Sequence, residues 1–329
     1  MSDTITATKR IMVILDGAAE PVWPWPSTLE EAAMPALDAL CDAGTVARVA
    51  TTPPGLPAGS EIGIPTLLGA PPERPVARGL VEAAAAGVDV PEGAGAWRVD
   101  LHHADGRRSV TAEALLLKPE VADLLRDHEV LHLKGHRLLA VGEARPEIRT
   151  VASLFAHVWD DGAPLPRILD DRTVIVCAPG AAAGCGRLLG ARVVTPKGAT
   201  GDVGSDLWAK TRAALAALPE ADTVVVHVGG ADEAAHHRDR VGKKAMLEAA
   251  DQDVVRPLAR AAHDAGGVLA VTSDHATCVE TGRHDAAPVP VAIAGRGVPR
   301  SGPLRMHERL AVNTKVLSTP WAAEGRSRA

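Results

Sequence analysis

The sequence Ile11-Met12-Val13-Ile14-Leu15-Asp16-Gly17 joins a short apolar run to a turn. An uninterrupted apolar run of this length, rich in branched side chains, is typical of a strand covered on both faces of a parallel sheet. The dipeptide Asp-Gly favours a turn directly after it. We therefore expect a buried strand over residues 11–15, with Asp16 at its carboxyl end.

Two later stretches repeat this pattern. Residues 223–228 and 268–272 are β-branched and apolar, and each is preceded by a helical stretch. Residues 28–33 and 35–40 read as two further helices, the second ended by Gly44. Strands that alternate with helices in this way predict an α/β fold, with a mostly parallel sheet flanked by helices.

The middle of the chain has a different pattern, which predicts an inserted domain. Residues 97–103 and 108–110 read as a hairpin around Asp105-Gly106, residues 119–127 as a helix and residues 130–141 as a strand. A hairpin-rich block inside a parallel α/β chain is typical of an inserted, smaller α+β cap domain. We predict a discontinuous core domain over residues 1–75 and 190–329, and a cap domain over residues 76–189.

Composition excludes several classes of function. The 329 residues carry a net charge of −6 and only 2% aromatic residues, which disfavours nucleic-acid binding and a polybasic membrane surface. The N-terminal apolar run is too short for a signal sequence or a membrane span. The four cysteines lack the paired spacing of zinc or redox sites, so we expect inert thiols and a cytoplasmic protein.

Acidic and imidazole side chains follow all three predicted strands. These residues are Asp16 after the first strand; Asp232 and His236 after the second; and Asp274, His275 and His284 after the third. The carboxyl ends of parallel strands meet at one edge of a sheet, so these groups are expected to converge. Carboxylates and imidazoles together suit Mn²⁺ or Zn²⁺ better than Mg²⁺. Taken singly, Asp16-Gly17 is more typical of a turn and Asp274-His275 of a solvated or capping pair, and His236-His237 could equally lie on an exposed helix face.

The segment PAGSEIGIPTLLG, residues 57–69, resembles the nucleophile segment of the archaeal-type cofactor-independent phosphoglycerate mutases of the alkaline phosphatase superfamily. Most of the chain falls into register with that family. The other matching segments are Asp16-Gly17; Thr28 to Asp38; Arg78 to Ala83; Gly198 to Gly201 with Lys210; His227 to His236; and Asp274-His275 with His284 and Pro288-Val289-Pro290.

The resemblance implies an alkaline-phosphatase-like fold with two divalent metal ions and no organic cofactor. By this resemblance, one ion is held by Asp232, His236 and His284, and the other by Asp16, Asp274 and His275 with the Ser60 hydroxyl. Ser60 is then the nucleophile, because metal coordination stabilises its alkoxide. Mn²⁺ is the favoured ion, and Zn²⁺ or Co²⁺ would suit the same ligands.

The resemblance also implies a small phosphorylated carboxylic acid as substrate, with no nucleic-acid or membrane partner. The expected reaction converts 3-phosphoglycerate to 2-phosphoglycerate through a phosphoserine. Candidate substrate contacts in the cap are Arg78, Arg98, His136 and Arg137, because Arg presents a planar fork of donors to anions. Lys210 is a candidate contact to the phosphoryl oxygens. The sequence leaves the oligomeric state open.

Departures from the family pattern keep other functions open. Glu61 replaces the family's Asp beside the nucleophile, Ile64 replaces its Asn, and the chain is shorter between Trp159 and Asp171. A less complete cap would admit water to the site, so a divergent phosphohydrolase, or a phosphoryl or phosphonyl transferase acting on another small acid, is the alternative. A metal-binding protein that has lost catalysis is a third hypothesis, against which the complete ligand set argues.

Overall fold

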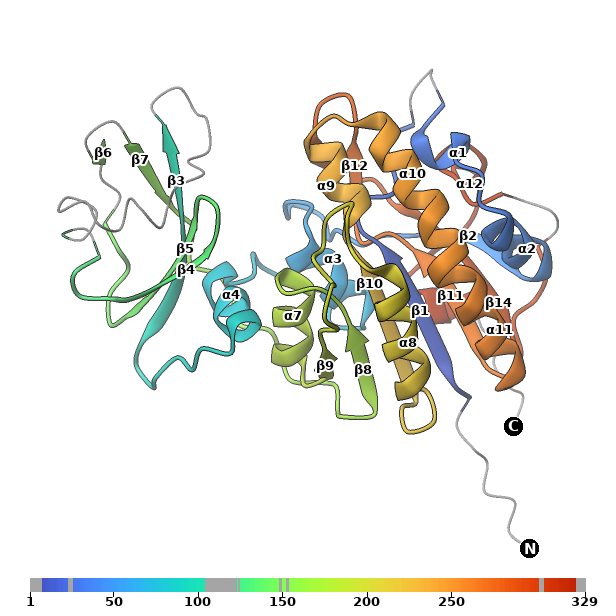
Figure 1. Ribbon diagram of the computed structural model, residues 1–329, viewed down its shortest axis with the longest axis horizontal. Helices are drawn as coiled ribbons and strands as arrows, with labels where there is room; N and C mark the ends of the chain where they lie inside the picture. Colours follow the sequence, from blue (N-terminus) through green and yellow to red (C-terminus); the bar gives the residue numbers. More distant parts are fainter. Residues whose placement is uncertain are drawn as a thin grey trace, which may run out of the picture.

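The computed structural model describes residues 8–22, 26–103, 123, 125–147, 150–151, 154–301 and 305–323. These residues form an eight-stranded sheet, a five-stranded sheet and a two-stranded ribbon (Figure 1). The order in the eight-stranded sheet is β15 (Val316–Leu317), β2 (Thr45–Val49), β14 (Val289–Gly295), β11 (Val268–Thr272), β1 (Arg10–Leu15), β10 (Thr223–Val228), β8 (Thr173–Val176) and β9 (Arg192–Val194).

The eight-stranded sheet is mostly parallel, as predicted. Strands β9, β8, β10, β1 and β11 are parallel to one another, whereas β14 is antiparallel to both β11 and β2. The three strands predicted at residues 11–15, 223–228 and 268–272 are confirmed as β1, β10 and β11. The parallel block places their carboxyl ends at one edge.

Helices cover both faces of this sheet. Along β1, Ile11, Val13 and Leu15 join one apolar cluster, and Met12 and Ile14 join another. This alternation is what a strand covered on two sides requires. The helices and helical turns are α1 (Thr28–Glu31), α2 (Pro35–Ala43), α3 (Ser60–Leu67), α4 (Arg78–Ala86), α7 (Ala181–Leu189), α8 (Leu207–Ala217), α9 (Gly230–His236), α10 (Arg240–Ala250), η1 (Asp251–Val255), α11 (Arg256–Asp264), α12 (Glu308–Ala311) and η2 (Pro320–Ala323).

The first cluster packs under α2, α8, α10 and α11, and the second packs under α3 and α7. The predicted helices in the N-terminal region are confirmed as α1 and α2, and Gly44 ends α2. All four cysteines are buried and unpaired, as expected of inert thiols. Within the described ranges, no helix has the length and apolar character needed to cross a membrane.

The five-stranded sheet is antiparallel and lies beside the larger sheet, with α4 between them (Figure 1). Its order is β4 (Glu129–Lys134), β5 (Arg137–Gly142), β3 (Gly95–His103), β7 (Leu154–Val158) and β6 (Thr150–Val151). Residues 130–141 form two strands rather than the single strand predicted, because Gly135 at φ 56° turns the chain between them. The predicted hairpin strand at 108–110, and most of the predicted helix at 119–127, lie outside the described residues.

The smaller sheet spans residues 95–158, a shorter range than the predicted cap at 76–189. Strand β8 and helix α7 fall within that predicted range, but β8 pairs in parallel with β10 in the larger sheet. Helix α7 packs against α3 and α4 through buried small residues. The apolar run of β8 therefore belongs to the core sheet, and the chain returns to the core before residue 173.

Candidate functional site

The candidate site lies at the carboxyl edge of the eight-stranded sheet. Strand β1 lies between β10 and β11, so the three carboxyl ends are neighbours. Asp16 directly follows β1, and Asp274 and His275 follow β11. Asp232 and His236 lie one turn apart on α9, which begins just after β10. The structure thus brings together side chains that are far apart in the sequence.

The first group of predicted metal ligands is Asp232, His236 and His284. His236 Nε2 lies 3.2 Å from Asp232 Oδ2, His284 Nε2 lies 3.4 Å from Asp232 Oδ1, and the two Nε2 atoms are 3.1 Å apart. Each Nδ1 faces a backbone carbonyl, of Gly282 at 2.9 Å and of Ala58 at 3.0 Å. A carbonyl only accepts, so in the neutral rings both Nδ1 atoms are protonated and both Nε2 lone pairs face each other. A cation between them would satisfy both lone pairs.

The second group of predicted metal ligands is Asp16, Asp274 and His275. His275 Nε2 lies 3.4 Å from Asp16 Oδ1 and 3.5 Å from Asp274 Oδ2. Burial raises the pKa of Asp16 well above its usual value, and the charges of Asp274 and Asp232 raise it further. Among the described residues, Asp16 Oδ1 and Asp274 Oδ2 are buried without a hydrogen-bond partner. Unpaired buried carboxylate oxygens are costly, so this geometry also favours a bound cation.

Ser60 is the first residue of α3 and faces the second group. Its Oγ lies 3.4 Å from His275 Nε2. A helix N-terminus favours negative charge, so it would stabilise an alkoxide at the predicted nucleophile Ser60. The close approach of α3 depends on Gly63, where a Cβ would lie 2.1 Å from the Asp274 carbonyl oxygen. Gly63 therefore allows α3, and with it Ser60, to lie close to the carboxyl end of β11.

Thr277 links the two ligand groups. It lies in β12 (Ala276–Cys278), directly opposite His284 in β13 (Arg283–Asp285). Its Oγ1 donates to Asp232 Oδ1 at 2.6 Å and lies 3.2 Å from His275 Nδ1. Because the hydroxyl has one proton, it accepts from His275 Nδ1–H, and the Nε2 lone pair then faces Asp16. Thr277 thereby orients one ligand from each group.

A buried cluster of charged residues, Lys243, Glu20 and Glu308, supports the backbone of Thr277. Lys243 Nζ donates to the Thr277 carbonyl at 2.8 Å and lies 3.3 Å from Glu20 Oε1. The Glu20 carboxylate also accepts from the Thr28 hydroxyl, and the Glu20 amide donates to Glu308 Oε1 at 2.6 Å. The Lys243 side chain has no exposed area. Glu20 therefore balances the charge of the buried Lys243, whose hydrogen bond fixes the backbone of β12.

A cavity of about 390 Å³ opens over Ser60 and reaches the cap. Three of the predicted substrate contacts, Arg78, Arg98 and Arg137, line it, together with Trp159. Two others do not line it. The His136 ring is turned toward Asp100, with Nε2 at 3.8 Å from Oδ2. Lys210 is fully buried, donates to the His227 carbonyl at 2.7 Å, and has a pKa lowered to about 8 by burial.

A chain of ion pairs connects α3 to the cap sheet. Glu61 Oε2 lies 2.6 Å from Arg78 Nη1, and Arg78 Nε lies 2.9 Å from Glu82 Oε1. Glu82 Oε1 also lies 3.3 Å from Arg98 Nη1, and Arg98 Nε lies 2.8 Å from Asp100 Oδ1. All five side chains are largely buried. Arg78 and Arg98 are therefore already paired within the protein.

Arg137 differs from these two arginines. Its side chain makes no hydrogen bond or ion pair with any residue that the structure describes. Burial lowers the pKa of Arg137, and the neighbouring charges of Arg98 and Arg78 lower it further. An unpaired arginine held beside two others and lining the cavity is suited to an anion.

The profile of the metalloenzyme superfamily matches residues 8–318. The chain belongs to the metalloenzyme superfamily. It is 26% identical to the 2,3-bisphosphoglycerate-independent phosphoglycerate mutase 1 of Archaeoglobus fulgidus, over 88% of this chain and 90% of that protein. This relative confirms the resemblance inferred from the motifs.

Solved structures confirm the fold of this superfamily member. The PH0037 protein from Pyrococcus horikoshii superposes with a TM-score of 0.79 at 23% identity, covering 96% of this chain and 95% of that one. The cofactor-independent phosphoglycerate mutase from Thermoplasma acidophilum superposes with a TM-score of 0.58 at 17% identity, covering 96% and 98%. The α/β architecture with a smaller inserted sheet is therefore shared with known proteins.

Membership in the metalloenzyme superfamily agrees with the donor atoms of the site. Three groups of side chains offer ligand atoms within 4.8 Å of one another; they are Asp232, His236 and His284; Asp16, His227 and Asp274; and Asp16, Asp232 and His275. Carboxylates and imidazoles in these combinations suit divalent transition metals. A bound cation would also satisfy the unpaired carboxylate oxygens and the two imidazole lone pairs that face each other. The residues present therefore fit a divalent metal.

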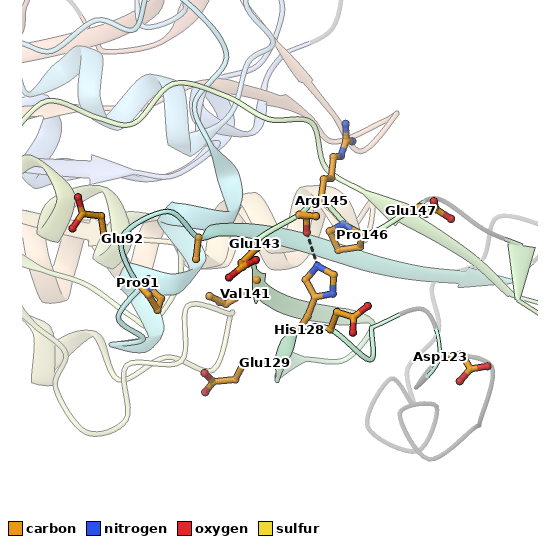
Figure 2. Close-up of a pocket in the computed structure, with 14 residues that line it drawn as sticks. Pro91, Glu92, Asp123, His128, Glu129, Val141, Glu143, Arg145, Pro146 and Glu147 are labelled. Atoms are coloured by element: carbon orange, nitrogen blue, oxygen red, sulfur yellow. Dashed lines mark hydrogen bonds between the residues drawn. The ribbon is translucent and has the colours of Figure 1, made fainter.

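A larger cavity, of about 840 Å³, lies in the cap and is acidic. Figure 2 shows Glu92, Glu129, Glu143 and Glu147 around it, with His128 hydrogen-bonded to the Ala144 carbonyl at 2.6 Å. A surface so rich in carboxylates repels a phosphorylated acid at neutral pH. The cavity over Ser60 also contains carboxylates, but Arg78, Arg98, Lys134 and Arg137 line it as well, so it is the more basic of the two.

Two site residues were not predicted from the sequence. Thr277 gave no signal, because a threonine in a short strand is ordinary. His227 stands in the apolar stretch Thr-Val-Val-Val-His-Val, where an imidazole is unusual, and it lines the cavity over Ser60. Burial lowers the pKa of His227 to about 4, so this ring is neutral. The position of a basic side chain at the end of a buried strand was the available signal.

Proposed function

We propose that this protein is a metal-dependent phosphomutase that converts 3-phosphoglycerate to 2-phosphoglycerate through a phosphoserine at Ser60. The observation that carries the proposal is the place of Ser60 Oγ, 3.4 Å from His275 Nε2 at the N-terminus of α3. Relatives across most of the chain are named as 2,3-bisphosphoglycerate-independent phosphoglycerate mutases, which supports the same reaction.

The proposed ligands of two divalent ions are the two groups described above. Asp232, His236 and His284 would hold one ion, and Asp16, Asp274 and His275, with Ser60, would hold the other. Mn²⁺ is the proposed ion, and Zn²⁺ or Co²⁺ would suit the same donors. When bound, such ions lower the pKa of the serine hydroxyl and offset negative charge on the phosphoryl oxygens.

Ser60 Oγ loses its proton and forms a bond to phosphorus as the bond from phosphorus to the substrate oxygen breaks, and the freed oxygen of glycerate takes up a proton to become a hydroxyl. The glycerate then turns within the cavity, and its other hydroxyl loses its proton as it receives the phosphoryl group from Ser60, whose Oγ is protonated again. Arg137 is the proposed contact for the glycerate carboxylate, because it is the unpaired arginine of the three that line the cavity. The smaller sheet serves as the cap that excludes water.

A second function is favoured by the chain of ion pairs. Glu61, Glu82 and Asp100 neutralise Arg78 and Arg98, so these arginines offer little charge to a leaving acid. An acid held mainly by Arg137 would dissociate before accepting the phosphoryl group again. Water or another small acid would then accept it, which makes the protein a phosphohydrolase or a phosphoryl or phosphonyl transferase.

A ³¹P-NMR time course with 3-phosphoglycerate and the Mn²⁺-loaded protein separates these functions. The mutase gives a growing 2-phosphoglycerate signal that disappears in Ser60→Ala and persists in Ser301→Ala, because Ser301 lies beside Gly44 and does not line the cavity. Inorganic phosphate that requires Ser60 would establish the hydrolase. No turnover of either phosphoglycerate rejects the mutase. In Arg137→Met, the KM for the substrate should rise at least tenfold while the protein remains folded.

A further inference from the structure

His227 lies on the face of the sheet that carries the nucleophile helix. Side chains alternate along β10, with Val224, Val226 and Val228 in the cluster under α8 and α10, and Val225 in the cluster under α3. His227 therefore follows Val225 on the α3 face, at the carboxyl end of the strand. Its backbone is paired with Ile14 of β1, two residues before Asp16. The imidazole is 7% exposed and lines the cavity over Ser60.

The Nε2 atom of His227 is buried without a hydrogen-bond partner among the residues described. It lies 3.4 Å from Asp16 Oδ2, too far for a good hydrogen bond. Asp16 Oδ1 and Asp274 Oδ2 are also buried and unpaired. Ligand atoms of these three side chains all lie within 4.8 Å of one another. Three converging unpaired atoms are costly unless one ligand satisfies them together.

Neighbouring groups of the protein do not supply that ligand. Among the described residues, Lys210 is a buried cation beside His227, but its ammonium group donates to the His227 carbonyl and not to the imidazole Nε2. His275 faces Asp16 and Asp274 with its own Nε2 lone pair, because its Nδ1 donates to Thr277. Two ligand atoms that bind one ion at about 2.1 Å in a tetrahedral arrangement lie roughly 3.4 Å apart. The separation of His227 from Asp16 matches that spacing.

We propose that His227 is a further ligand of the ion held by Asp16 and Asp274. The inference rests on the two-metal arrangement proposed above. It gives this ion two imidazoles, of His227 and His275, beside its two carboxylates. A donor set with two imidazoles selects Mn²⁺, Zn²⁺ or Co²⁺ over Mg²⁺, which prefers oxygen ligands. His227 would thereby determine which metal occupies the position next to Ser60.

The test measures metal binding rather than turnover. Protein stripped of metal is titrated with Mn²⁺ by calorimetry, as wild type and as the variants His227→Phe and His227→Gln, with circular dichroism to confirm folding. His237→Phe and His237→Gln are matched controls, because His237 is an exposed histidine next to a ligand. In parallel, ¹⁵N-imidazole NMR of the wild type counts the rings whose Nε2 binds Zn²⁺. This count needs no variant to fold.

We expect four zinc-bound imidazoles in the wild type, those of His227, His236, His275 and His284. In both His227 variants, one of the two ions should bind at least about tenfold more weakly, as when other residues that support a metal site are replaced. The His237 variants should bind both ions with wild-type affinity. Two bound ions with only three zinc-bound imidazoles, or an unchanged Mn²⁺ affinity in a folded His227 variant, would overturn the role of His227 but not the two-metal arrangement. A single ion bound to the wild type would overturn the two-metal arrangement as well.

Discussion

Thr277→Val tests whether one hydroxyl orients both ligand groups. Valine keeps the shape of threonine, and the backbone of Thr277 is held independently, by the Ala19 carbonyl at its amide and by Lys243 at its carbonyl. The substitution therefore removes the hydroxyl and little else. Asp232 Oδ1 loses its 2.6 Å donor, and His275 Nδ1 loses its acceptor.

The expected effect follows from these two contacts. A hydrogen bond to a charged group contributes about 1.5–3 kcal/mol, and Thr277 has no exposed area through which water could replace it. Since about 1.4 kcal/mol corresponds to a factor of ten, the affinity for Mn²⁺ should fall roughly 10- to 100-fold. Residues that orient metal ligands show losses of the same size.

Calorimetric titration of metal-free protein with Mn²⁺ measures this loss. Thr277→Ser is the matched control, because it keeps the hydroxyl and removes a methyl group; it should bind Mn²⁺ within a few-fold of wild type. Equal affinity in Thr277→Val and wild type would refute the assigned role of the hydroxyl. Equal losses in the valine and serine variants would show that packing, not hydrogen bonding, is responsible.

Three further predictions concern stability. Glu61→Gln should lower the free energy of unfolding by about 3 kcal/mol at pH 7 by guanidinium titration, since it breaks a buried pair; an unchanged value contradicts this. Burial raises the pKa of Glu61, but the charge of Arg78, a backbone hydrogen bond and the charges of His275 and His284 together lower it more, so its folded pKa is below normal. The ion pair therefore stabilises the folded protein above the unfolded pKa of about 4.3. The difference in free energy of unfolding between wild type and Glu61→Gln should vanish as pH falls through the folded pKa of Glu61. Lys243→Met should cost about 3–5 kcal/mol, because Glu20 loses its cation, and wild-type stability would contradict it. Chelation of ions present at about 100 times Kd should lower the Tm by about 5 °C by calorimetry, and an unchanged Tm would argue against a bound metal.

The core of the fold was predictable from local sequence. The strands β1, β10 and β11 are short β-branched runs ended by turn formers, and nothing in their surroundings opposes strand formation. The convergence of Asp16, Asp232 and Asp274 followed from parallel strand order alone. Such features depend on periodicity and topology, which a sequence carries directly.

The limits of the cap and the pairing of its arginines were not predictable. The apolar run of β8 is compatible with either sheet, and only its pairing with β10 assigns it to the core. Arg78 and Arg98 are of the residue type that usually contacts anions, but Glu61 and Glu82 neutralise them from elements that are distant in sequence. Thr277 likewise acquires its role from two partners that only the tertiary structure supplies.

The residues of the site lie far apart in the sequence, and this separation determines when the site can form during folding. The amide of Gly17 contacts the carboxylate of Asp274, 257 positions later in the chain. During synthesis Asp16 therefore emerges with no ligand partners, and contacts of such high sequence separation form late in folding. A nascent or truncated chain has no assembled metal site. A metal ion held by these residues would therefore bind only after the fold is complete, and would come from the ions available at that time.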